Sequence, residues 1–404
     1  MLFNSVRPDY CAGGEAQSGL GRCLMLVGAL TFSTAVTAGW QDPLQTPAMT
    51  TSKAHQGLLL DITDAGERLV SVGAHGHIIY SDDQGMNWQQ GQVPVTVTLT
   101  ATDFANDRHG WVVGHDGVIL HSGDGAITWE KQFDGFLANK AMMASAEENL
   151  AEAEARTEAV AGSGSDLEID QAMTALETAQ FALQDAEYDL ETGSTKPFLD
   201  VYFSDENTGM VVGAYGMAFE TEDGGRTWKE FSSRLPNPNR LHMNRITRVG
   251  ESSLVITGEM GLMLRSDDMG KNWVALEAPY EGSLFGLEDM GDYQLLFALR
   301  GHLFRSEDDG ISWTALEDVT EQTLLGATSG DRGAMLVGNG GAVVTLDSRF
   351  NNPSVNTIQG RKGLSAVIRS RSGYYVVAGE AGIQLVGRDG ALADKQISMI
   401  AGGE

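Results

Sequence analysis

Cysteine is nearly absent from this chain of 404 residues, because only Cys11 and Cys23 occur. The chain beyond residue 23 can therefore form no disulfide, thiolate metal site or cysteine nucleophile. Basic residues are also scarce, with 27 Lys and Arg against 55 Asp and Glu and a net charge of −28. This balance argues against general nucleic-acid binding, which requires neutralisation of phosphate, and against adhesion to anionic lipid.

Long hydrophobic runs are missing as well. The one prominent apolar segment, CLMLVGALTFSTAV, follows Arg22 and leads into the small residues around Ala38. It is too short for a comfortable membrane span, and its flanks are typical of an export signal. We predict a signal peptide over 1–38, an N-terminal segment over 39–56, a periplasmic location and no lipid insertion after cleavage. A retained N-terminal anchor is the alternative; Cys23 precedes the apolar run, which disfavours a lipoprotein.

Glycine, by contrast, is abundant at 50 residues. Part of it belongs to an eight-residue box, [ST]-x-D-x-G-x-x-W, that occurs five times, with Ala126 as the one break at the glycine position. The Asp and Trp of the boxes are Asp83 and Trp88, Asp124 and Trp129, Asp223 and Trp228, Asp268 and Trp273, and Asp308 and Trp313. Most boxes are roughly 40 residues apart, which is the signature of a repeat architecture.

A second signature, an apolar strand followed by G-x-x-G, precedes the first four boxes, has a degenerate copy at Ala298 and Gly301 before the fifth, and also occurs twice where the box has decayed, at Gly338 and Gly379. Counting this feature gives seven repeats. Each repeat contains four short alternating segments punctuated by turn residues, which predicts four strands per unit. Four strands per 40 residues is typical of a propeller blade, so we predict an all-β, seven-bladed β-propeller over 57–404. Residues 44–56 are a candidate for the strand that closes the ring.

The acids of the boxes are open to two interpretations, calcium binding or catalysis on one side and turn architecture on the other. An aspartate in a tight turn accepts backbone N–H groups, and glycine supplies a positive φ. Five equivalent sites suit a folding role, whereas catalysis needs one. We therefore predict structural boxes, and no catalytic residue, cofactor or metal ion.

An insertion over 137–196 interrupts the repeats between the second and third units. Apolar residues at a spacing of three and four, including Leu150, Leu176 and Leu183, predict an antiparallel helical hairpin with Asp166 as an N-cap. Residues 140–196 hold 13 acids and 3 bases. We interpret the hairpin as a docking arm for a partner; a solvated hairpin without a partner is the alternative.

Basic residues concentrate in two stretches of this acidic chain. They are Arg234, Arg240, Arg245 and Arg248 in the first, and Arg361, Lys362, Arg369 and Arg371 in the second. Because arginine pairs bidentately with carboxylates, these residues are candidate partner contacts. Scattered surface charge is the alternative.

The boxes resemble the Asp-box, or BNR, repeat of sialidases, some endoglucanases and sortilin-type receptors. Combined with G-x-x-G at a 40-residue period, they resemble the photosystem II assembly and stability factor family of seven-bladed propellers. Bacterial members of this kind imply a non-enzymatic periplasmic accessory of a membrane complex, with an RND (MMPL-like) transporter as the favoured client. A photosystem II assembly factor is the second reading. An Asp-box carbohydrate-binding protein or glycoside hydrolase is the third, although Arg234-Leu-Pro follows a box instead of preceding the boxes as in sialidases.

Overall fold

The computed structural model describes residues 41–316, 319–330, 333–347 and 353–400, so the predicted signal peptide lies outside the described residues. Strands fill successive antiparallel sheets, here called blades 1 to 7. Blade 1 holds β1 (Leu59–Ala65), β2 (Arg68–Gly73), β3 (Ile78–Ser81) and β4 (Asn87–Gln90); blade 2 holds β5 (Leu99–Phe104), β6 (Gly110–Gly114), β7 (Ile119–Ser122) and β8 (Glu130–Phe133); blade 3 holds β9 (Phe198–Phe203), β10 (Gly209–Gly213), β11 (Ala218–Thr221) and β12 (Lys229–Glu230).

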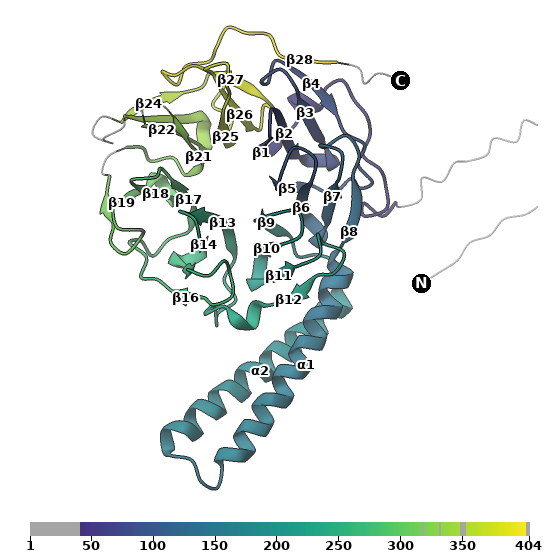
Figure 1. The fold of residues 1–404 in the computed structure, drawn as a ribbon, viewed down its shortest axis with the longest axis vertical. Helices are drawn as coiled ribbons and strands as arrows, with labels where there is room; N and C mark the ends of the chain where they lie inside the picture. Colours follow the sequence, from purple (N-terminus) through teal and green to yellow (C-terminus); the bar gives the residue numbers. More distant parts are fainter. Residues whose placement is uncertain (1–40, 317–318, 331–332, 348–352, 401–404) are drawn as a thin grey trace, which may run out of the picture. The chain divides into compact units, whose positions relative to one another are not determined.

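Blades 4 to 6 follow the same plan, whereas blade 7 has three strands instead of the predicted four. Blade 4 holds β13 (Met243–Val249), β14 (Ser253–Gly258), β15 (Met263–Ser266) and β16 (Val274–Ala275); blade 5 holds β17 (Leu284–Asp289), β18 (Gln294–Ala298), β19 (Leu303–Ser306) and β20 (Thr314–Ala315); blade 6 holds β21 (Leu324–Gly330), β22 (Gly333–Gly338), β23 (Ala342–Asp347) and β24 (Ser354–Thr357); blade 7 holds β25 (Leu364–Arg369), β26 (Tyr375–Gly379) and β27 (Gln384–Val386). The first strand of each blade contacts the first strands of the two neighbouring blades, and β25 returns to β1 (Figure 1). The predicted seven-bladed propeller is confirmed.

The hydrophobic core lies between the blades rather than within any one of them. Seven buried clusters occupy the seven blade junctions, because a four-stranded sheet cannot bury both faces alone. Each box tryptophan packs against the preceding blade; Trp129, for example, joins Val70 and Tyr80 of blade 1, and Trp88 joins Val376 of blade 7. The indole of the box is therefore a joint between neighbouring blades.

The ring is closed by the end of the chain. Strand β28 (Ser398–Met399) pairs in parallel with β4 and extends blade 1 at its outer edge. Residues 44–56, our candidate for the closing strand, contain no strand. Instead, the turn η1 (Ala54–Gln56) seats on blade 7, where the Ile383 N–H donates to the His55 carbonyl at 2.9 Å. The candidate was wrong because these residues form turns. Their backbone groups make isolated hydrogen bonds to neighbouring blades and do not pair with a strand in a regular ladder.

Antiparallel strands place the loops of every blade on two opposite faces. The boxes, for example at 81–88, and the turns between first and second strands lie on one face, here called the Asp-box face. The G-x-x-G turns, such as η2 (Ala74–Gly76) and η3 (His115–Gly117), lie on the other. The helical insertion leaves β8 and returns to β9 on this second face, here called the hairpin face.

The first glycine of G-x-x-G permits a close approach of two backbones. A Cβ atom on Gly73 would lie 2.2 Å from the Leu58 carbonyl oxygen, at the point where β1 shifts register between Leu59 and Asp61. The same register shift recurs at the start of β5, β13, β17, β21 and β25. The motif is thus a device for bulging the innermost strand.

The insertion forms two antiparallel helices, α1 (Gly135–Val160) and α2 (Asp166–Thr192), that project beyond the rim of the ring (Figure 1). The N-cap of α2 is Ser165, one residue earlier than predicted, because Ser165 and Glu168 form a reciprocal capping box. At the base of the hairpin, the Asn139 amide donates to the carbonyls of Asp189 and Gly193 at 2.7 and 2.9 Å. Ala138 and Met142 belong to the core between blades 2 and 3, so the base is part of the propeller.

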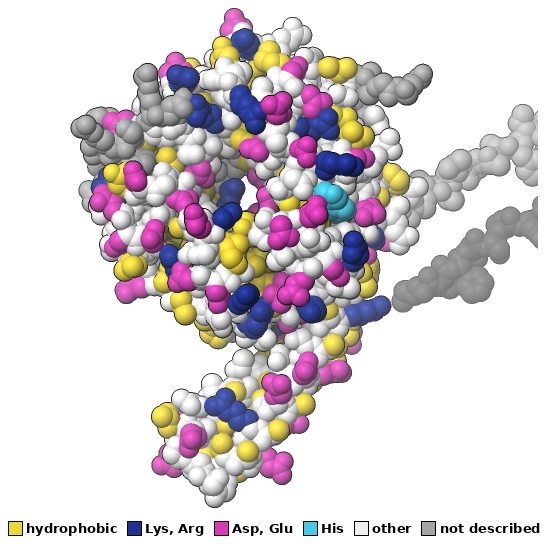
Figure 2. Space-filling view, viewed as in Figure 1, with side chains coloured by type: hydrophobic (Ala, Val, Ile, Leu, Met, Phe, Trp, Pro, Cys, Tyr) yellow, Lys and Arg dark blue, Asp and Glu magenta, His cyan; other side chains and the backbone are white. Residues whose placement is uncertain are grey.

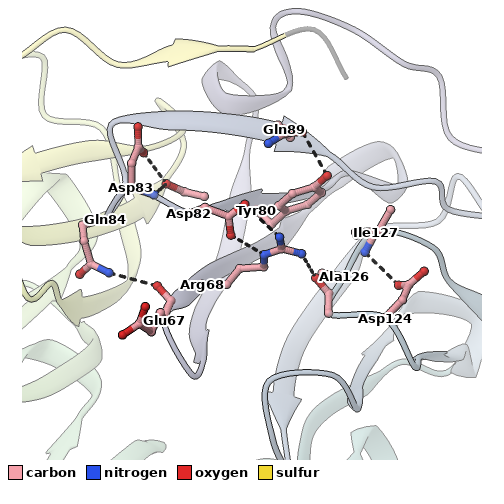
Figure 3. Close-up of polar contacts among 12 residues, drawn as sticks. Glu67, Arg68, Tyr80, Asp82, Asp83, Gln84, Gln89, Asp124, Ala126 and Ile127 are labelled. Carbon is pink, nitrogen blue, oxygen red and sulfur yellow. Dashed lines mark hydrogen bonds and ion pairs between the residues drawn. The ribbon is translucent and has the colours of Figure 1, made fainter. Parts of the chain in front are cut away.

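Polar side chains also tie neighbouring blades together on the Asp-box face. Arg68 forms two hydrogen bonds to Asp82, at 2.6 and 2.9 Å, and stacks its guanidinium 4.3 Å from the Tyr80 ring centroid (Figure 3). The same guanidinium donates to the Gly125 carbonyl, in the box turn of blade 2, at 2.5 Å. One arginine on β2 thereby fixes the next blade in position.

We expect Arg68→Ala to lower the free energy of unfolding by about 1–2 kcal/mol. The substitution removes a hydrogen bond to a partly buried carbonyl, a cation–π contact and an ion pair with an exposed partner, whose contribution is small. Urea unfolding of the two proteins measures the difference. Lys53→Ala, at an exposed position, is the matched control and should change stability by less than about 0.5 kcal/mol. Equal effects of the two substitutions would contradict the bridging role.

Candidate functional site

Each Asp box is a closed network of hydrogen bonds. In the first, Asp83 Oδ1 accepts the Asn87 N–H at 2.7 Å, and Oδ2 accepts the Asn87 amide at 2.6 Å. The Ser81 hydroxyl donates to Asp83 and accepts the Gly85 N–H, both at 2.9 Å. The Trp88 indole donates to the Gly85 carbonyl at 3.0 Å. Both carboxylate oxygens are therefore engaged within the turn.

The other four boxes repeat the carboxylate and hydroxyl contacts around Asp124, Asp223, Asp268 and Asp308. The indole hydrogen bond recurs at Trp129 and Trp273. Ala126 adopts a φ of +73°, so it occupies the left-handed position that glycine fills in the other boxes. Hydrogen bonds from the Asn272 side chain and backbone lower the pKa of Asp268 to about 2. A carboxylate held ionised by its own turn suits an architectural role, because both oxygens of Asp268 accept hydrogen bonds from Ser266 or Asn272.

The structure divides both arginine-rich stretches between opposite sides of the ring. Arg234, Arg240, Arg361 and Lys362 lie in connections on the hairpin face; Arg248, Arg369 and Arg371 lie at or near turns on the Asp-box face; Arg245 lies in the central channel. The cause is geometric, because a strand of six or seven residues carries its two ends about 20 Å apart. On the face shown in Figure 2, basic and acidic side chains are intermixed rather than gathered into one patch.

Several of these basic residues pair with acids of the chain itself. Arg234 pairs with Glu220, Lys362 lies 3.8 Å from Glu380, and Arg371 donates to Glu67 at 2.8 Å. Arg240 reaches across to the hairpin and pairs with Asp185 of α2 at 2.7 Å. Sequence proximity therefore predicted a set of candidates but not a common surface.

The central channel holds a group of acids that sequence reasoning missed. Asp61, Asp103, Asp200 and Glu288 lie on the first strands of blades 1, 2, 3 and 5. Each accepts a backbone N–H from the first strand of the following blade, at distances from 2.6 to 3.0 Å. Because this contact recurs at equivalent strands, we infer that the acids hold neighbouring blades together. In the sequence, the acids occupy the third residue of β1 and β9 and the fifth residue of β5 and β17, and these positions lie on the same face of a strand.

Burial in the channel raises the pKa of these acids. The pKa of Asp103 rises to about 6, and those of Asp200 and Glu288 rise to about 7. The positive charge of Arg245 opposes the shift at Asp61, Asp200 and Glu288, without cancelling it. The Arg245 side chain fits because β17 has Gly286 beside it, where a Cβ atom would lie 2.9 Å from Arg245 Cδ.

The hairpin presents different apolar residues from those that the sequence singled out. Leu150, Leu176 and Leu183 are half-buried on the helix stripes that also carry the buried alanines Ala146, Ala153, Ala172, Ala179 and Ala186. The large apolar side chains that remain exposed on the two helices are Phe136, Leu137, Leu167, Met173, Phe181, Tyr188 and Leu190. The 3,4 spacing identified the stripes but not which large residues the partner helix would leave uncovered.

A groove of about 1080 Å³ lies between the hairpin and the connection from blade 3 to blade 4. Both helices form its floor, from Met142 to Arg156 on α1 and from Asp170 to Ala186 on α2. Residues 232–240 form the opposite wall. Two contacts hold the wall to the floor: Arg240 with Asp185, and the Ser145 hydroxyl with Glu230 at 2.8 Å.

Within the described residues, no three His, Cys, Asp or Glu side chains are arranged to hold a metal ion. None of the described helices combines the length and the apolar character needed to cross a membrane. A stacked pair, His109 and His121, lies on blade 2 with ring nitrogens 3.3 Å apart. The pair completes no ligand set with its neighbours.

Comparison with known proteins places this ring and its boxes in a family. The model of the family described as "Photosynthesis system II assembly factor YCF48" matches residues 80–149 and 178–382, which together make up more than half of the chain. Residues 150–177, the outer half of the hairpin, fall in the gap between the two matched segments.

Individual relatives agree with this match. The photosystem II assembly lipoprotein Ycf48 of Synechococcus sp. (strain CC9902) is 39% identical over 88 residues, which cover 22% of this chain and 26% of that relative. Among solved structures, YCF48 bound to a D1 peptide aligns with a TM-score of 0.56 at 13% identity, over 84% of this chain and 97% of that one. YCF48 from Cyanidioschyzon merolae aligns with a TM-score of 0.54 at 14% identity, over 84% and 96% of the two chains. The chain therefore belongs to the family of YCF48-type photosystem II assembly factors.

Proposed function

We propose that this protein is a non-enzymatic assembly factor that binds a segment of a membrane-protein subunit. The observation that carries the proposal is the family match over most of the ring. The geometry supports it, because the recurring acids of the boxes and of the channel are consumed by hydrogen bonds that hold the blades. A glycosidase would instead need two carboxyl groups free to face a sugar at a set separation.

The client favoured by the comparisons is a photosystem II subunit. One structural neighbour is a YCF48 that holds a D1 peptide, and the curated relative is named a photosystem II assembly lipoprotein. No finding favours the RND-type transporter that we placed first from the sequence. An extracytoplasmic location, in the periplasm or an equivalent compartment, fits both the apolar segment after Arg22 and the name of the relative.

Affinity purification from membranes solubilised in mild detergent tests this function. We expect the tagged protein to retain a membrane-protein subunit at near-stoichiometric yield, identified by mass spectrometry. Recovery of a photosystem II subunit would support the favoured client, and an RND-type transporter would replace it while preserving the scaffold role. A tagged protein that elutes without any membrane subunit, or one that cleaves a panel of glycans, would contradict the proposal.

A further inference from the structure

We propose that the groove between the hairpin and residues 232–240 binds a basic, amphipathic helix of the client. This inference rests on the proposed function in one respect only, namely that the client is a protein. Part of the groove's floor, including Glu152, Arg156 and Asp170, lies in the gap of the family match, whereas the wall and the rest of the floor lie in the matched segments.

The shape of the floor suits a third helix. From Met142 to Arg156, α1 contributes roughly 20 Å of length at 1.5 Å per residue. The side chains along the floor are small, mainly alanine, serine and threonine, with Ala175 and Ala182 half-buried on α2. Small residues allow helix axes to approach to about 8 Å, so a third helix can lie along the hairpin. Phe181, 60% exposed, supplies a large apolar contact at the edge.

The negative charge of the residues that line the groove favours a basic partner. Four carboxylates line it, from Glu152, Asp170, Asp185 and Glu230, against Arg156 and Arg240. The insertion around them is strongly acidic, with 13 acids and 3 bases over residues 140–196. A helix with an alanine- and leucine-rich face flanked by lysine or arginine complements both the floor and its rim. An acidic peptide or an anionic lipid surface would be repelled.

The groove is preformed rather than assembled on binding. Its wall is fixed by Arg240 to Asp185 and by Ser145 to Glu230, and its base is anchored through Asn139 and the pairing of Lys196 with Asp189. A preformed site avoids the entropic cost of ordering its own side chains. The client segment need only adopt its helix.

A peptide-binding measurement tests the charge and place of the site. The probe is an amphipathic peptide of about 20 residues with a Leu/Ala face and lysine flanks, and its counterpart carries glutamate in place of each lysine. We expect the lysine peptide to bind the full chain at least about tenfold more tightly than the glutamate peptide, and more weakly as salt increases. Ala175→Lys, on the floor, should weaken binding by about tenfold or more, whereas Gln180→Lys adds the same charge outside the groove and should change it less than about threefold.

A truncated hairpin provides the second variant. Removing two heptads from each arm, residues 147–160 and 169–182, keeps the capping box at Ser165 and the contacts of Arg240 and Asn139. We expect the ring to unfold at an unchanged urea concentration while binding of the lysine peptide is lost. Equal binding of the two peptides, equal effects of the two lysine substitutions, or full binding by the truncated chain would each overturn the proposal.

Photo-crosslinking in the native membrane separates this inference from the proposed function. A p-benzoylphenylalanine replaces Phe181 at the groove or, as a control, Tyr188, which is 65% exposed and does not line it. The proposal expects Phe181-specific crosslinks to a segment rich in lysine or arginine and predicted to be helical. Crosslinks to an acidic segment, or equal labelling from both positions, would overturn it. Capture of no membrane subunit by the ring, with peptide binding intact, would instead remove the proposed function alone.

Discussion

Gly382→Ala is expected to lower the free energy of unfolding by about 3 kcal/mol or more, because Gly382 lies where blade 7 contacts η1 and blade 1. Gly382 has a φ of +75°, which costs an alanine about 1–2 kcal/mol. A Cβ atom there would lie 2.0 Å from the His55 carbonyl oxygen and 2.6 Å from Gln56 Cα, so the backbone of η1 must move. Crowding of this kind in a packed interior adds a further 1–3 kcal/mol, roughly.

The displaced backbone also accepts a hydrogen bond that joins blade 7 to the segment before blade 1. Ile383 donates its N–H to His55, and the buried Ala54 belongs to the core between these two blades. We therefore expect hydrogen–deuterium exchange to accelerate in residues 54–59 and 376–386, before any change elsewhere. The loss is local first, because each of the other six junctions has its own core.

Gly360→Ala is the matched control. Its φ is +92°, but no atom lies within 4 Å of the position that its Cβ would take. Urea unfolding should report only the cost of the conformation, about 1–2 kcal/mol, and exchange at residues 54–59 should stay unchanged. If the two substitutions cost the same, closure does not depend on the seat of η1 against blade 7.

The ring was predictable because its determinants recur. Five boxes, six G-x-x-G turns and one A-x-x-G turn repeat one local chemistry, and each repeat can be interpreted independently of the others. The closing strand was not predictable for the opposite reason. β28 has only Ser398 and Met399 in register with β4, and so short a pairing carries no periodicity. Its place follows from the seven-fold closure of the ring, which is a property of the whole chain.

In the candidate site, too, local patterns predicted some features and missed those that depend on tertiary contacts. The 3,4 spacing predicted the hairpin, and the acidic composition indicated its surface, but the groove needs residues 232–240, which no local pattern connects to α2. Likewise Arg240 and Arg245 are five positions apart, yet one braces the hairpin and the other enters the channel. Function at a junction between repeats depends on tertiary contacts that a sequence records only in scattered single residues.

Asp200→Asn is expected to stabilise the protein at pH 8 while leaving its stability at pH 4 nearly unchanged. Burial raises the pKa of Asp200 from 3.8 to about 7, against the attraction of Arg245. Between pH 4 and pH 7 the folded protein therefore keeps a proton that the unfolded chain has released. Because the folded state binds more protons in this window, stability falls as the pH rises through it.

Asparagine preserves the useful contact and removes the cost. Its amide oxygen can accept the Ile246 N–H, as Asp200 does at 2.7 Å, without a buried charge. The rise in the pKa of Asp200 from 3.8 to about 7 sets an upper limit of about 4 kcal/mol. Because the Asp200 side chain is only half-buried, solvent screens part of this, and we expect a gain of about 1–3 kcal/mol at pH 8.

Urea unfolding of both proteins at intervals from pH 4 to pH 8 measures the effect. Asp61 and Glu288 share the field of Arg245 and are present in both proteins. The charge of Asp61 also raises the pKa of Asp200, so the difference between variant and wild type reports residue 200 together with its coupling to Asp61. Asp292→Asn, which removes the same charge in an exposed turn, is the matched control and should change stability by less than about 0.5 kcal/mol. A variant less stable than the wild type at pH 8, with the gap closing on acidification, would mean that the attraction of Arg245 outweighs desolvation. The channel would then be held by ion pairing rather than by the hydrogen bonds between its first strands.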